Sequence, residues 1–180
     1  MTLIPVDPLR RARLAVGIVF LVNGAVFGSW APHIPLVQER LGLGPAVLGA
    51  ALLAAAVGAL LAMLGAGALI ARYGSAPVTR VSGLMLCVSL PVVALAPDLA
   101  FLVAALALFG ASNGIMDVAM NAHGVAVETR LQQPIMSSLH GMFSLGGLLA
   151  RGDAGGLVDG DFGGRCLRGF ALRGEPAGVV

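Results

Sequence analysis

The chain has 180 residues, of which 58% are hydrophobic and only 11% are charged, and its mean hydropathy is +0.93. Soluble proteins carry roughly 25% charged residues, so this chain has too few to cover a surface that faces water. A net charge of +2, with no basic stripe and a single Tyr, excludes nucleic acid as a partner. The composition predicts a membrane protein whose main partner is the lipid bilayer.

Charge-free apolar runs predict helices that cross the membrane, because about 20 apolar residues span its hydrocarbon core. After a cytoplasmic tail of residues 1–13, we expect helices at about 14–34, 46–71, 79–97 and 99–121, and the start of a fifth at 136–150. The run at 14–34 also resembles a signal peptide, but it is longer than a usual signal core and further spans follow it.

The arginines predict the orientation of these spans. With a cytoplasmic N-terminus, six arginines lie inside and only Arg40 lies outside, as the positive-inside rule requires. We therefore expect a multi-pass protein of the bacterial inner membrane. Residues 151–180 differ in character, being rich in Gly, Arg and Asp, and their abrupt start predicts a frameshift or truncation, with a short natural tail as the alternative.

The stretch "SNGIMDVAMNAH" places three polar residues at the end of an apolar run. Asn113, Asp117 and Asn121 have the spacing i, i+4, i+8, which puts them near one face of a helix. Because an ionisable side chain inside hydrocarbon costs roughly 2.5–3.5 kcal/mol, this face is expected to line a pathway for a solute or a proton. The alternative is that Asp117 is a structural anchor at the inner membrane surface.

The first helix has a similar face. Asn23 is expected near the bilayer midplane, either lining the same pathway or hydrogen-bonding a neighbouring helix. Trp30 is expected to be an anchor at the membrane interface or a ring that stacks on a substrate in the cavity.

Three further titratable residues lie near the cytoplasmic side. His123 and Glu128 are expected to be solvated or to cap a loop, with proton transport as the alternative. His140 would enter the fifth helix from the inside, where its imidazole could titrate near neutral pH, so Asp117 and His140 are the candidates for proton coupling.

Small residues four apart indicate tight helix packing. These pairs are Gly24 and Gly28, Gly58 and Ala62, and Gly110 and Gly114. The two cysteines are far apart, with Cys87 expected to be a small buried side chain. No metal or cofactor motif is present in the sequence, so we expect no catalytic residue, no metal and no cofactor.

Three stretches resemble parts of bacterial major facilitator superfamily transporters. Residues 20–60 resemble the first two helices, residues 110–128 the fourth helix, and residues 134–148 the start of the fifth. The likeness is greatest to the fucose-permease-like and sugar-transporter-like branch. The superfamily has a Gly-x-Leu-x-Asp-Arg-x-Gly-Arg-Arg loop between its second and third helices. The segment "GALIARYGSA" matches it at Gly67, Leu69, Arg72 and Gly74, but it has Ala71 in place of the acid, and Ser75 and Ala76 replace the final arginines.

The resemblance implies a helical bundle corresponding to the N-terminal half, helices one to four and the start of five, of a twelve-helix transporter. It also implies transport of a small polar solute such as a sugar, with proton or ion coupling, and the need for a second six-helix half. Two other functions remain open. One is a non-transporting helper that associates through its glycine faces, and the other is an intramembrane serine protease with Ser112 as nucleophile and His140 as base.

Overall fold

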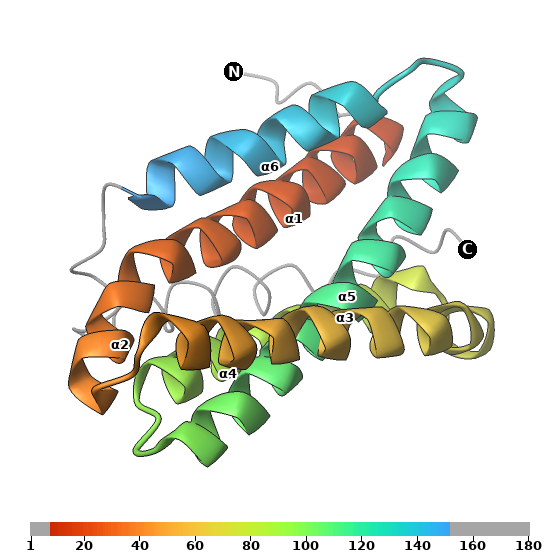
Figure 1. The fold of residues 1–180 in the computed structure, drawn as a ribbon. Coiled ribbons are helices and arrows are strands. Elements are labelled where there is room, and N and C mark those ends of the chain that lie inside the picture. The colour runs from red at the N-terminus through yellow and green to blue at the C-terminus, as the bar shows by residue number, and fades with distance from the viewer. Residues whose placement is uncertain (1–7, 152–180) are drawn as a thin grey trace.

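The computed structural model describes residues 8–151, and every element in that range is a helix (Figure 1). The order is α1 (Pro8–Trp30), a 3₁₀ turn η1 (Ala31–His33), α2 (Ile34–Leu41), α3 (Pro45–Tyr73), α4 (Ser75–Ala94), α5 (Leu99–Leu131) and α6 (Met136–Arg151). Residues 1–7 and 152–180 lie outside the described part. The predicted tail of residues 151–180 therefore falls outside it, except for Arg151, which ends α6.

Four of these helical segments are long and apolar enough to cross a membrane: Pro8–Leu41, Pro45–Tyr73, Ser75–Ala94 and Leu99–Leu131. The prediction of an all-α, multi-span bundle is therefore confirmed. The helices extend beyond the apolar runs, because charge-free residues mark the hydrocarbon layer and not the ends of the helix. α1 begins at Pro8 and not at 14, and α5 continues to Leu131 instead of ending at 121.

Local sequence explains where the helices begin and end. Pro45 stands at the first position of α3, where its missing N–H costs nothing. Gly74 alone separates α3 from α4 and has φ of 83°, a conformation that side chains disfavour. Asp98 caps α5, since its carboxylate accepts a hydrogen bond from the Phe101 backbone N–H at 2.8 Å.

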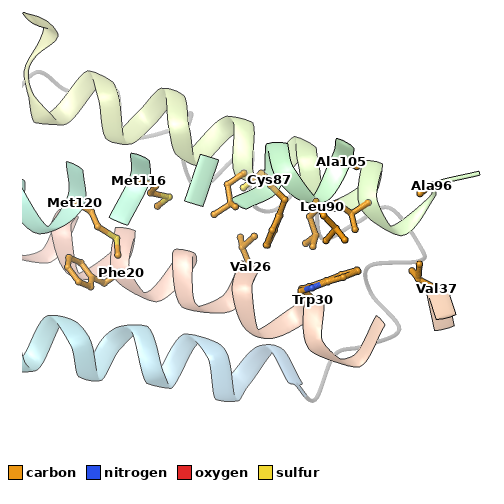
Figure 2. Packing of buried hydrophobic residues seen from close by; sticks show 14 of the residues in the cluster. Phe20, Val26, Trp30, Val37, Cys87, Leu90, Ala96, Ala105, Met116 and Met120 are labelled. Atoms are coloured by element: carbon orange, nitrogen blue, oxygen red, sulfur yellow. The ribbon is translucent and has the colours of Figure 1, made fainter. Parts of the chain in front are cut away.

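The helices associate in two close pairs. α6 lies alongside α1, and α3 packs against α5, which also carries α4 (Figure 1). A smaller contact between α1 and α5 joins the pairs. Its core contains Phe20, Val26 and Trp30 of α1 with Met116 and Met120 of α5 (Figure 2).

Glycines bring the backbones of each pair into contact. A Cβ on Gly24 would overlap the Phe143 carbonyl oxygen of α6, and one on Gly28 would lie 2.6 Å from the Gly147 Cα. In the other pair, a Cβ on Gly110 would overlap the Ala55 carbonyl oxygen of α3. These glycine faces are thus occupied within the chain, whereas Gly65 and Gly67 of α3 have open space around them and leave the helper alternative a free face.

Candidate functional site

The polar face of α5 forms as its spacing predicts. Asn113, Asp117 and Asn121 are all half-buried on one side of the helix. The Asn121 side-chain amide donates to the Asp117 carboxylate at 3.2 Å and to the Asp117 backbone carbonyl at 2.8 Å. These hydrogen bonds fix two of the three polar side chains relative to each other.

Asp117 lies well inside α5. It is 18 residues after Leu99 and 14 residues before Leu131. At 1.5 Å per residue, about 27 Å of helix precede it and about 21 Å follow it. The helix thus continues well beyond Asp117, and both interpretations of this residue, a pathway group and an anchor at the inner membrane surface, stay predictions.

His140 of α6 is exposed and packs against α1, where its ring lies 5.5 Å from the Phe20 ring, measured between centroids. It is near enough to Asp117 of α5 for the two charges to influence each other, although no hydrogen bond joins them in residues 8–151. The structure thereby brings the two candidates for proton coupling together, although 23 residues separate them in the sequence. Nothing in the sequence alone indicates this pairing.

Asn23 connects α1 to α5. The side chain is 1% exposed, and its Nδ2 donates to the Met120 sulfur at 3.6 Å (the two residues are 97 apart in sequence). Its Oδ1 is buried with no hydrogen-bond partner within the described residues. Asn23 therefore joins α1 to α5, as one of its two expected roles requires, while its role in a pathway stays a prediction.

Trp30 is buried between helices and does not face lipid. Its ring lies 6.4 Å from that of Phe109 of α5, and Phe27 stacks on Phe109 at 6.5 Å. Figure 2 shows the Trp30 indole in the space between α1 and the helices opposite it. This burial favours a ring that lines the protein interior over one that faces lipid, and the role of Trp30 at a substrate stays a prediction.

At the junction of α3 and α4, the residues that match or replace the family motif have the following contacts. Gly67 is exposed, and the Arg72 guanidinium lies 5.2 Å from the centre of the Tyr73 ring. Ser75, which stands where the family has an arginine, pairs instead with His123 of α5, with 3.0 Å between Oγ and Nδ1.

Glu128 caps a helix, as one of its expected roles requires. Its Oε2 accepts hydrogen bonds from the backbone N–H groups of Ile135 at 2.7 Å and Met136 at 2.8 Å, where α6 begins. One polar residue escaped the sequence reasoning: His33 in η1 is 4% exposed, and its Nε2 has no partner among the described residues. The only sequence signal that could have indicated it is its position between two prolines, in "PHIP".

The two residues of the protease alternative, Ser112 and His140, are not hydrogen-bonded to each other in the described part of the chain. Ser112 is buried and its Oγ donates to the Leu108 carbonyl at 2.9 Å, while His140 Nδ1 lies 3.0 Å from the Met136 carbonyl. Each side chain is bonded within its own helix. Within residues 8–151, no group of His, Cys, Asp and Glu side chains is arranged to hold a metal ion.

Comparison with known proteins supports a transporter. The chain is 37% identical over 153 residues to an uncharacterised MFS-type transporter of Yersinia pestis, a match that covers 85% of this chain and 40% of the relative. It is 38% identical over 139 residues to an uncharacterised transporter of Sinorhizobium fredii, covering 77% of this chain and 36% of the relative. It is also 37% identical over 148 residues to the membrane protein MosC of Rhizobium meliloti, covering 82% and 36%.

The chain thus spans about two fifths of the length of the curated relatives it matches. No family profile matches it, and no solved structure does so either. With four helices able to cross a bilayer and relatives of this kind, the chain is a multi-pass, all-α membrane protein similar over most of its length to MFS-type transporters.

Proposed function

We propose that this chain forms the N-terminal part of a major facilitator superfamily secondary transporter in the bacterial inner membrane. The transporter moves a small polar solute of the sugar class, driven by a proton. The observation that carries the proposal is the half-buried Asp117 carboxylate, which lies on the polar face of a long apolar helix and accepts a hydrogen bond from Asn121. A membrane helix tolerates such a carboxylate where it faces protein or water, and there it marks a pathway for solute or protons.

The proposed pathway runs along the side of α5 that bears Asn113, Asp117 and Asn121. Amide groups on this face bind hydroxyl groups of a solute, because an amide both donates and accepts hydrogen bonds. Asn23 adds an acceptor from α1, and Trp30 with Phe109 forms an aromatic wall. In this proposal Asp117 and His140 transfer the proton, because a carboxylate and an imidazole can each bind and release one.

A second six-helix half is part of the proposal. Alternating access moves two halves about a site near the bilayer midplane, and the described residues supply four spans and the start of a fifth. The relatives, more than twice as long as the matched segment, leave room for such a half. The fucose-permease-like branch, and with it a sugar substrate, rests on the likeness of residues 20–60 and 110–148.

Uptake by reconstituted vesicles tests the proposal. We expect vesicles that contain the protein together with its second half to accumulate a radiolabelled sugar when the outside is acidic. A protonophore is expected to abolish that accumulation, because it removes the gradient that drives it. Vesicles with no protein are the control. Accumulation that needs no protein, or no uptake of any solute in a panel of sugars and polyols, contradicts the proposal.

The orientation is tested separately by labelling single cysteines in intact cells, with Cys87 and Cys166 replaced by Ser. The positions are Glu39 on α2 and Gln133 in the turn before α6, both of which are exposed. With a cytoplasmic N-terminus, a membrane-impermeant maleimide is expected to label Glu39→Cys in intact cells and Gln133→Cys only after lysis. The reverse pattern contradicts the proposed orientation.

A further inference from the structure

Glu128 holds the start of α6 from the helix that precedes it. The first amides of a helix have no partners within that helix, and a negative charge near them is favourable. Glu128, in the last turn of α5, reaches across the turn and accepts from two of these amides, at 2.7 and 2.8 Å. The carboxylate therefore fixes the N-terminus of α6 relative to α5 with two charge-assisted hydrogen bonds.

Met136 links this cap to His140. The Met136 N–H donates to Glu128, and the Met136 carbonyl lies 3.0 Å from Nδ1 of His140. A carbonyl oxygen can only accept, so Nδ1 must carry the hydrogen of that bond. In the neutral ring, Nε2 is then the nitrogen that remains free to bind a proton.

The first turn of α6 also packs closely against α5. Ile135 and Leu139 are 1% and 2% exposed. A Cβ built on Gly124 would lie 3.0 Å from both the Leu139 Cδ1 and the Met136 sulfur, so these side chains approach the α5 backbone closely at this point. His140 follows Leu139 directly, and the placement of this turn decides where its ring lies.

We propose that Glu128 is a positioning residue for the Asp117–His140 pair. By capping α6, it holds the Met136 carbonyl where it selects the Nδ1–H tautomer of His140 and leaves Nε2 free to bind a proton. This inference rests on the proposed proton coupling for its functional meaning. The mechanical link itself, from Glu128 through Met136 to His140, is independent of transport.

The link is tested by ¹⁵N NMR of the full chain, labelled at histidine, in lipid nanodiscs. The His140 signals are assigned from their loss in His140→Gln, and the spectra are recorded at a pH at which the ring is neutral. In the wild-type protein we expect a protonated Nδ1 and a bare Nε2. In Glu128→Ala we expect a mixture of both tautomers, because the carbonyl that selects one of them is no longer held.

Two variants sharpen the experiment. Glu128→Gln keeps an oxygen acceptor but loses the charge, so we expect a share of the Nε2–H tautomer between those of wild type and Glu128→Ala. Glu39→Ala removes an exposed carboxylate from α2 and is expected to match the wild type. If Glu128→Ala does not fold, Glu128→Gln carries the test, with a raised share of the Nε2–H tautomer as the expected result.

The inference is overturned if the folded Glu128 variants have the same tautomer populations of His140 as the wild type. It is also overturned if Glu39→Ala changes these populations as much as the Glu128 variants do. The proposed function fails by a different result, which is normal proton-driven uptake by a variant that lacks the Asp117 carboxylate. The two failures are therefore distinguishable, since the tautomer is read without any transport.

Discussion

Replacement of Asp117 by Asn is expected to reduce uptake to that of vesicles without protein, while the chain still inserts into the membrane. The variant keeps the shape of the side chain and an oxygen that accepts from Asn121, now 3.2 Å away. It loses the negative charge and the ability to bind a proton, and with them the interaction with His140. The measurement is proton-driven uptake by the complete transporter in vesicles, together with the amount of protein in the membrane fraction.

Asp98→Asn is the matched control for this variant. Asp98 directly precedes α5 and is exposed. It caps the helix through its Oδ1, an atom that Asn retains. We expect its uptake to remain close to that of wild type. Normal transport by Asp117→Asn reduces Asp117 to a structural polar residue and removes the observation on which the proposed function rests.

The sequence was sufficient to predict the spans and the polar face of α5. Both depend on local patterns, namely long runs without charge and the helical spacing of Asn113, Asp117 and Asn121. The ends of the helices were harder to predict than the spans, because α5 continues for ten residues beyond 121, where the expected span ended. Those residues include Glu128, whose capping of α6 depends on the turn that follows.

The contacts between helices could not be predicted from one sequence. Small residues at Gly24, Gly28 and Gly110 indicated close packing, but their partners are backbone atoms of α6 and α3 that no local pattern identifies. The position of His140 depends on this arrangement, because α6 lies along α1 and its first turn also packs on α5. The burial of Trp30 against Phe109 has the same origin.

Gly24→Ala is expected to lower the free energy of unfolding by separating α1 from α6. The new Cβ would overlap the Phe143 carbonyl oxygen and lie 3.0 Å from the Phe143 Cα, both of which are backbone atoms and cannot rotate away. Overpacking of this kind costs about 1–3 kcal/mol. That exceeds the gain of roughly 1 kcal/mol that Ala brings over Gly in a helix, so the net effect is destabilising. Unfolding by SDS in mixed micelles measures the difference.

Gly17→Ala on the same helix separates this packing effect from helix propensity. A Cβ at Gly17 would meet only the Leu139 Cδ2, at an ordinary contact distance of 3.9 Å. We therefore expect Gly17→Ala to be neutral or slightly stabilising, because it gains helix propensity without displacing α6. If both variants are equally stable, the close approach of α1 and α6 does not exist in the membrane. The position of α6 along α1 then loses its support.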